Sequence, residues 1–251
     1  MPAPALLVIA HGSRDPRHAA TVAALCERVR RQCPGLRVDV GHLDFDAPSV
    51  PQALHRLDAD GVRDVVALPL LLTRAFHAKS DIPAVLRETA ARLPRLRVTQ
   101  ADVLGPHGLL TTALERRLGQ AGVHPSHAAT TGIVLASAGS SDPEAIAVIA
   151  EIAREWRRTT GWCAVRPAFA SASLPRTADA VRALRADGVR RVAVAPYVIA
   201  PGFLPDRIAA GAAEAGADAV APVLGDAPEL ADLLLRRYRE ARASRPALAV
   251  A

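Results

Sequence analysis

The 251-residue chain has few aromatic residues: Phe, Trp and Tyr together make up 3% of it, although half of all residues are hydrophobic. A core of this composition depends on the packing of Ala, Val and Leu rather than of aromatic rings. The length suffices for one large domain or two small ones. The shortage of aromatics also leaves no stacking platform for single-stranded nucleic acid.

Long hydrophobic runs are missing as well. No apolar stretch approaches the ~20 residues that a membrane-spanning helix needs, so no membrane partner is expected. The first residues, MPAPALLVIAHGS, have no basic region, and their apolar stretch ends in a histidine rather than a cleavage site. We therefore expect this segment to be the first strand of a mature cytoplasmic protein.

Cysteine is scarce: the chain has three, Cys26, Cys33 and Cys163. None forms a CxxC pair or a spacing typical of a zinc or iron–sulfur site. The pattern favours free thiols, Cys26 and Cys33 in buried positions, and a reducing compartment.

Lysine is almost absent, because Lys79 is the only one among the 31 basic residues that give a net charge of +6. The guanidinium group suits carboxylates and phosphates, which indicates an anionic partner. The arginines alternate with acidic residues, as in ERVRR and EIAREWRR, a pattern typical of solvated helix faces. A nucleic-acid partner is therefore not expected.

Apolar strand-like runs alternate with helical stretches along the chain. Near-continuous apolar strands separated by helices predict an α/β fold, Rossmann- or flavodoxin-like, with parallel sheets covered on both faces. The loops that follow the strands then lie along one rim, where such folds bind ligands. In the first half we expect strands at 6–10, 36–43, 65–72 and 98–104, and helices near 16–32, 49–60, 79–93 and 107–120.

The second half repeats the first at an offset of 127 residues. LLVIAHGSRDP (6–16) returns as IVLASAGSSDP (133–143), and DADGVRDVVALP (58–69) as RADGVRRVAVAP (185–196). Agreement of separate blocks on one register indicates duplication. With the Gly- and Ser-containing segment 119–132 as a linker, we expect homologous half-domains at 1–122 and 131–251, related by a pseudo-twofold axis.

Two histidines distinguish the halves. His11 follows the first strand and His77 follows the third, but the matching positions of the second half hold Ala138 and Leu204. The loss of both imidazoles from equivalent rim positions favours a function for them in the first half. By contrast, both copies keep the Gly-Ser-x-Asp-Pro turn, in which Ser13 or Asp15 can cap the following helix and Pro16 suits its first turn, so we interpret this turn as scaffold.

A carboxylate joins the histidines, because Asp44 follows the second strand and its counterpart is Ser171. His11, His77 and Asp44 thus form a predicted His-His-Asp group in 1–122, and the site in 131–251 is degenerate. Such a group can bind a divalent ion and accept a proton near neutral pH, and whether the metal is structural or reacting stays open. We interpret the other histidines as surface, helix or outward-facing positions: His18, His42, His55, His107, His124 and His127.

The motifs after the first three strands resemble those of a known family. AHGSRDP after the first strand, an acidic residue before APS after the second and LLLTRAFHAKSDIP after the third are similar to the class II chelatases, and more closely to the CbiX and SirB sirohydrochlorin chelatases. The resemblance covers the whole chain, because long members are also two fused halves. It implies two chelatase-like halves around a cleft and insertion of Co2+ or Fe2+ into sirohydrochlorin, towards cobalamin or sirohaem. The metal is then a substrate, and no organic cofactor is implied.

The resemblance assigns roles residue by residue. His11 and His77 match the metal-binding and proton-abstracting histidines, and Asp44 stands where the family usually has glutamate. Ala75 replaces the usual glycine of the third motif. Because the substrate carries many carboxylates, the candidates for holding it are Ser13, Arg14, Arg74 and Lys79.

Two other functions remain open from the sequence. A non-catalytic carrier of metal or tetrapyrrole could use the same residues. A sugar- or phosphate-binding module would exploit a helix N-terminus, although the glycines match neither a P-loop nor GxGxxG. The sequence does not choose between cobalt, iron and nickel, and a monomer or weak homodimer is expected.

Overall fold

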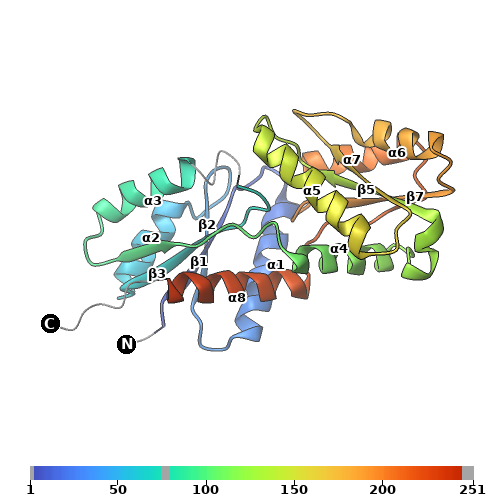
Figure 1. Ribbon diagram of the computed structural model, residues 1–251. Coiled ribbons are helices and arrows are strands. Elements are labelled where there is room, and N and C mark those ends of the chain that lie inside the picture. The colour runs from blue at the N-terminus through green and yellow to red at the C-terminus, as the bar shows by residue number, and fades with distance from the viewer. Residues whose placement is uncertain (1–2, 75–79, 245–251) are drawn as a thin grey trace. The chain divides into compact units, whose positions relative to one another are not determined.

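The computed structural model describes residues 3–74 and 80–244 and contains two four-stranded parallel sheets (Figure 1). The first has the order β2-β1-β3-β4 and the second the order β6-β5-β7-β8. The predicted α/β class with two similar parallel sheets is therefore confirmed. The strands are β1 (Ala5–Ala10), β2 (Val38–His42), β3 (Asp64–Pro69), β4 (Arg97–Gln100), β5 (Thr131–Ser137), β6 (Ala164–Phe169), β7 (Arg191–Tyr197) and β8 (Ala219–Val220).

Helices cover both faces of each sheet, which explains why the central strands are mostly apolar. All six residues of β1 are buried, as are all seven of β5. The helices are α1 (Pro16–Gln32), α2 (Val50–Ala59), α3 (Ile82–Ala91), α4 (Gly108–Gln120), the short 3₁₀ helix η2 (Pro125–Thr130), α5 (Pro143–Thr159), α6 (Thr177–Ala186), α7 (Phe203–Glu214) and α8 (Pro228–Ala243).

Several predicted elements are longer than those observed. The strands expected at 36–43 and 65–72 span Val38–His42 and Asp64–Pro69. The strand expected at 98–104 is limited to Arg97–Gln100, because beyond it the Asp102 carboxylate accepts a hydrogen bond from the N–H of Val103 and turns the backbone. The helix expected over 79–93 has its described α-helical part at Ile82–Ala91.

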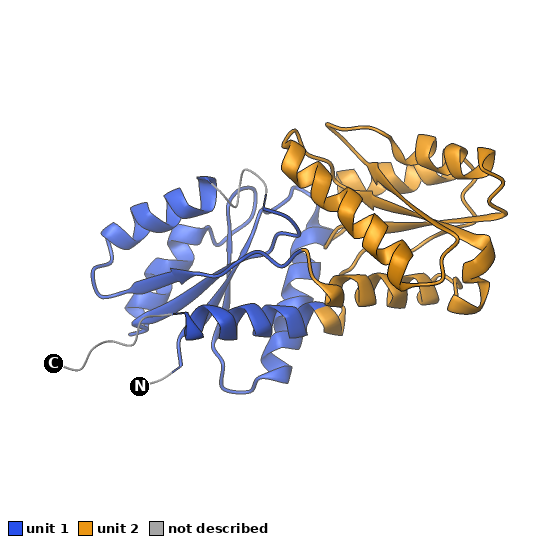
Figure 2. Ribbon diagram, in the orientation of Figure 1, with its two compact units in different colours: residues 1–105, 230–251 blue, residues 106–229 orange. Residues whose placement is uncertain are grey.

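The chain forms two compact units, residues 1–105 with 230–251 (unit 1) and residues 106–229 (unit 2) (Figure 2). This division differs from the expected half-domains at 1–122 and 131–251, because the last helix of each half packs in the other unit. Helix α4 follows β4 but lies in unit 2, and nearly all of α8 follows β8 but lies in unit 1. A sequence repeat shows which helix follows which strand, but not which sheet the helix covers.

Specific contacts hold these two helices in place. In unit 1, the Tyr238 hydroxyl of α8 donates to the Pro4 carbonyl over 2.7 Å. In unit 2, Arg117 of α4 donates to the Leu224 carbonyl over 2.6 Å and 3.1 Å. Each acceptor is a backbone carbonyl of the unit in which the helix packs. These bonds therefore hold α8 in unit 1 and α4 in unit 2, so that each half of the repeat gives its last helix to the other unit.

A carboxylate ties α4 to unit 2. Glu115 accepts hydrogen bonds from the indole N–H groups of Trp156 and Trp162, over 2.6 Å and 2.7 Å. These are the two tryptophans of the chain, and both are buried. A partly buried carboxylate needs such donors to offset its loss of hydration.

Within the described residues, no helix has both the length and the apolar composition to cross a membrane.

Candidate functional site

The turn from β1 into α1 carries the first predicted site residue, His11. The turn is closed by local hydrogen bonds: Ser13 Oγ accepts from the N–H of Asp15 over 3.1 Å, and Asp15 accepts from the N–H of Arg17 over 2.9 Å. Asp15 is the N-cap of α1 and Pro16 is its first residue, which confirms the predicted helix start. His11 lies just before this rigid turn and is half-buried.

A close backbone approach joins this turn to the loop after β2. Gly12 has φ +93°, and a Cβ placed on it would lie 1.8 Å from the Asp44 carbonyl oxygen. The N–H of Asp44 donates to the His11 carbonyl over 2.9 Å, and the N–H of Leu43 to Ala10 over 3.0 Å. Only glycine fits at position 12, and its absent side chain lets the His11 and Asp44 backbones meet.

The two carboxylates of the β2–α2 loop have different partners. Asp44 Oδ1 accepts from the N–H of Phe45 over 2.8 Å, within its own loop. Asp46 Oδ2 accepts from the N–H of Ser13 over 3.0 Å and lies 4.0 Å from His18 Nδ1. Asp46 therefore binds the β1–α1 turn through its side chain, whereas Asp44 binds it through its backbone. Asp46 was not among the predicted site residues, although its charge also disappears in the second half, at Ser173.

Phe45 stands between these aspartates and is a second residue of this loop that was not predicted to belong to the site. The residue is 51% exposed, and its φ of +62° lies in the left-handed region. Its ring centroid lies 6.2 Å from that of His11, with 28° between the planes, and Arg14 Cζ lies 5.1 Å from the same centroid. The loop therefore presents an aromatic ring beside the candidate imidazole.

Two further imidazoles, those of His18 and His42, lie near His11. Burial lowers the pKa of His18, the neighbouring His42 and His11 act in the same direction, and Asp46 opposes them. Nδ1 of His18 and Nε2 of His42 are buried without a hydrogen-bond partner in the described structure, and the other ring nitrogen of His42 lies 3.2 Å from the Pro48 carbonyl. His18 was interpreted as an ordinary helix position, but the fold places it against the site because it lies one turn into α1.

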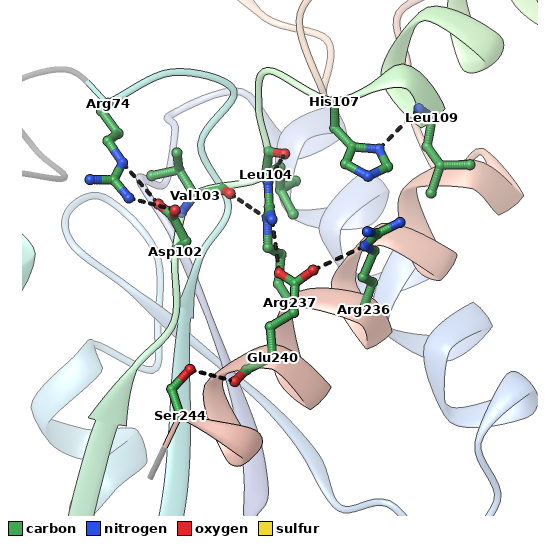
Figure 3. A network of polar contacts seen from close by, with 10 residues as sticks. All are labelled: Arg74, Asp102, Val103, Leu104, His107, Leu109, Arg236, Arg237, Glu240 and Ser244. Carbon is green, nitrogen blue, oxygen red and sulfur yellow. Dashed lines mark hydrogen bonds and ion pairs between the residues drawn. The ribbon is translucent and has the colours of Figure 1, made fainter.

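Arg74 comes from the loop after β3, and Asp102 neutralises its charge. The guanidinium donates to the Asp102 carboxylate over 3.0 Å and 2.5 Å (Figure 3). Burial acts to raise the pKa of Asp102, but the Arg74 guanidinium and the Val103 N–H outweigh it and hold this pKa below its ordinary value. The carbonyls of Val103 and Leu104 accept from Arg237 of α8, so the network reaches the exchanged helix (Figure 3).

The remaining predicted residues, His77 and Lys79, lie outside the described residues. Within 3–74 and 80–244, no group of three or more His, Cys, Asp or Glu side chains is placed to hold a metal ion. The structure therefore brings together the loops of His11 and Asp44, while the pairing of His11 with His77 stays a prediction.

The corresponding loops of unit 2 keep the backbone of this site. Gly139 has φ +92°, and a Cβ on it would lie 1.9 Å from the Ser171 carbonyl oxygen. The N–H of Ser171 donates to the Ala138 carbonyl over 3.0 Å, and Ala172 has φ +57°. The side chains at these positions carry neither an imidazole nor a carboxylate.

A cavity of about 630 Å³ lies within unit 2, between α4, α5 and the end of β7. Its lining includes Trp156, Ile152, Thr112 and Tyr197, and burial raises the pKa of the Tyr197 hydroxyl. None of the predicted site residues lines this cavity, so it carries no part of the candidate site.

A comparison of the sequence with models of known protein families identifies the family of this chain. A family model for CbiX matches residues 5–121 and again residues 132–241. The chain belongs to the CbiX family. The predicted resemblance is thereby confirmed, and the two matches of the CbiX model fall on the two halves of the sequence repeat.

Two relatives named as sirohydrochlorin chelatases are similar to most of the chain. The chain is 27% identical over 205 residues to the sirohydrochlorin cobaltochelatase of Priestia megaterium, a match that spans 81% of the chain and 66%, about two thirds, of that protein. It is 26% identical over 204 residues to the sirohydrochlorin ferrochelatase of the same organism, covering 81% of the chain and 76% of that protein.

A solved structure has the same architecture as this CbiX-family chain. SirB from Bacillus subtilis with Fe3+ superposes with a TM-score of 0.84 at 25% identity, and the match covers 96% of each chain. The likeness extends over both sheets and the helices that cover them.

Proposed function

We propose that this chain is a sirohydrochlorin chelatase, an enzyme that inserts Co2+ or Fe2+ into sirohydrochlorin in cobalamin or sirohaem biosynthesis. The divalent metal is a substrate of the reaction. The observation that carries the proposal is the fixed position of His11, at the rim of β1 beside the Asp44 loop, in a chain that the CbiX model matches in both halves. Relatives named for cobalt and for iron support the reaction and leave the metal open.

His11 and His77 bind the incoming ion in this proposal, and one of them takes a proton. Metallation releases two pyrrole protons while the ion loses part of its water shell. Neutral imidazole suits both tasks, because it is a ligand for borderline divalent ions and its ordinary pKa of ~6.5 lies near neutral pH. Asp44 beside His11 orients an imidazole or relays the proton to solvent.

The basic residues of the rim hold the substrate's carboxylates. Arg14 is exposed and forms no ion pair with a described carboxylate, so its charge is available. Arg74 is already paired with Asp102 and would bind a substrate carboxylate only through its remaining N–H groups. Ser13 offers its hydroxyl proton, because its Oγ already accepts from Asp15, and Lys79 completes the set.

Site-directed variants test this assignment. Purified protein mixed with sirohydrochlorin and Co2+ or Fe2+ should accelerate the spectral change of metallation, and His11→Ala or His77→Ala should reduce the rate about 100-fold or more. His55→Ala is the matched control, because His55 is exposed on α2 and outside the site. Melting temperatures of all three variants should stay within a few degrees of the wild type.

A non-catalytic carrier is the second candidate function, since binding needs the same residues. Stoichiometric binding of sirohydrochlorin or metal without any acceleration of metallation would favour the carrier over the enzyme. Loss of acceleration in the two site variants, with the control unchanged, supports the enzyme.

We also propose that the protein is cytoplasmic and a monomer or weak homodimer, with one site per chain, in unit 1. Light scattering after size-exclusion chromatography over a range of concentrations tests the oligomeric state. A dimer that persists at the lowest concentration measured would contradict this part of the proposal.

A further inference from the structure

Phe45 is an apolar side chain in an unusual setting. The residue is 51% exposed, and its backbone has φ +62°, a region that bulky residues rarely occupy. Contact of an apolar residue with water gives up part of its hydrophobic stabilisation. Neither property stabilises the fold, so the ring has another role.

The loop conformation does not depend on this ring. The turn is held by the Asp46 N–H donating to the Asp44 carbonyl over 2.7 Å and by the Phe45 N–H donating to Asp44 Oδ1. In unit 2 the equivalent Ala172 has φ +57°, and the N–H of Ser173 makes the same bond to Ser171. A methyl group is therefore sufficient at this position.

The surroundings of Phe45 indicate what it binds. The ring lies between the candidate imidazole of His11, at 6.2 Å, and the guanidinium of Arg14, at 5.1 Å. An exposed aromatic face suits a flat conjugated ring, and the adjacent guanidinium, which has no carboxylate partner among the described residues, suits a carboxylate on its edge. Both features occur together in a planar macrocycle with acidic side chains.

We propose that Phe45 is a positioning residue for the tetrapyrrole: its exposed ring packs against the macrocycle while Arg14 binds a peripheral carboxylate. This contact places the pyrrole nitrogens next to His11, the group that we assign to metal binding or proton removal. The inference rests on the proposed function for the identity of the macrocycle. Unit 2 has Ala172 in place of Phe45 and therefore lacks this aromatic ring as well as the histidine.

Kinetics separate positioning from a structural role. In Phe45→Ala, KM for sirohydrochlorin should rise about tenfold, since a stacking contact is worth roughly one order of magnitude in affinity. KM for Co2+ should stay within about twofold, because the ring contributes no metal ligand. Phe45→Tyr should restore the wild-type KM, and Phe45→Gly should behave as Phe45→Ala in KM although glycine accepts the positive φ without strain.

Phe203→Ala provides the matched control, because Phe203 is also exposed and has Arg207 Cζ 5.7 Å from its ring centroid. It should leave KM unchanged. An equal rise in KM for Phe203→Ala and Phe45→Ala, or no rise for Phe45→Ala, would overturn the inference.

A binding measurement distinguishes this inference from the proposed function. The dissociation constant for metal-free sirohydrochlorin, measured by its fluorescence, should also rise about tenfold in Phe45→Ala. If the wild type binds sirohydrochlorin in this Phe45-dependent way but does not accelerate metallation, the proposed function fails and the role of Phe45 in binding is supported. If the wild type accelerates metallation while the dissociation constant is unchanged in Phe45→Ala, the role of Phe45 in binding is refuted and the proposed function is supported.

Discussion

The rim loops of unit 1 and unit 2 have nearly the same backbone and different chemistry. Gly12 and Gly139 have φ +93° and +92°, and each approaches a carbonyl of the neighbouring loop so closely that a Cβ would clash. The residue before each glycine is His11 in unit 1 and Ala138 in unit 2. The backbone therefore requires glycine in both units, whereas neither unit requires the histidine.

The neighbouring loops differ in the same sense. In unit 1 the carboxylates of Asp44 and Asp46 accept from backbone N–H groups, including that of Ser13. In unit 2 the hydroxyls of Ser171 and Ser173 donate to backbone carbonyls over 2.9 Å and 2.6 Å. Unit 2 thus closes its loops with short neutral groups, and unit 1 does so while keeping two negative charges beside its imidazoles.

The largest effect should come from breaking the backbone that the units share. Gly12→Ala and Gly139→Ala should each lower the free energy of unfolding by about 3–5 kcal/mol, because the new Cβ meets a carbonyl oxygen and φ is strained. Gly35→Ala is the control for strain alone, since Gly35 has φ +89° with open space around it, and should cost about 1 kcal/mol. Urea unfolding measures all three, and equal losses at Gly12 and Gly35 would show that the close approach is not the cause.

A transfer of side chains should fail to transfer the chemistry. Ala138→His with Ser171→Asp, made in a His11→Ala background, should leave the rate of metallation about 100-fold below the wild type, because unit 2 still lacks the ring of Phe45 and has Leu204 in place of His77. The measurement is the initial rate with sirohydrochlorin and Co2+. Recovery to more than about a tenth of the wild-type rate would show that the unit 2 loops need only these two groups.

Smaller differences should separate Asp46 from Ser173. Asp46→Ala removes a charged acceptor from the Ser13 N–H and should lower the free energy of unfolding by about 2 kcal/mol, whereas Ser173→Ala removes a neutral bond and should cost about 1 kcal/mol. Urea denaturation of the two variants checks the order. A larger loss for Ser173→Ala would contradict the view that charge strengthens the unit 1 loop.

The smallest effect concerns the thiols. Burial raises the pKa of Cys26 in unit 1 to about 12, so this thiol stays protonated and unreactive at about pH 8 and becomes a thiolate only as the pH approaches that value. Cys33 and Cys163 are only half-buried. A colorimetric disulfide reagent should therefore label two thiols in the folded protein and three after denaturation, and rapid labelling of Cys26 in the folded protein would show that α1 opens locally.

Local patterns were enough to predict the fold class, because parallel α/β structure is encoded in alternating apolar runs and helix starts. β1 and α1 lie within one residue of the expected ranges, and the repeat located the counterparts of each in the second half. The exchange of α4 and α8 between the units could not be predicted, since it depends on contacts such as that of Tyr238 with Pro4 across most of the chain.

The site was partly predictable for a related reason. His11 was identified by its loss from the second copy, and the sequence offered the same signal for Asp46, replaced by Ser173, and for Phe45, replaced by Ala172. Their roles depend on contacts between two loops, which a spacing along the chain does not reveal. The lowered pKa of His18 likewise depends on its burial and on two other histidines, His42 and His11. Neither histidine is adjacent to His18 in the sequence.

The placement of α4 and α8 has a consequence for any attempt to divide the protein. A cut in the segment between α4 and β5 would separate the two copies of the sequence repeat. The first fragment would then carry α4, which belongs to unit 2, and the second would carry α8, nearly all of which belongs to unit 1. We therefore expect neither fragment to fold by itself, whereas joining the halves in one polypeptide supplies both of these helices in equal number.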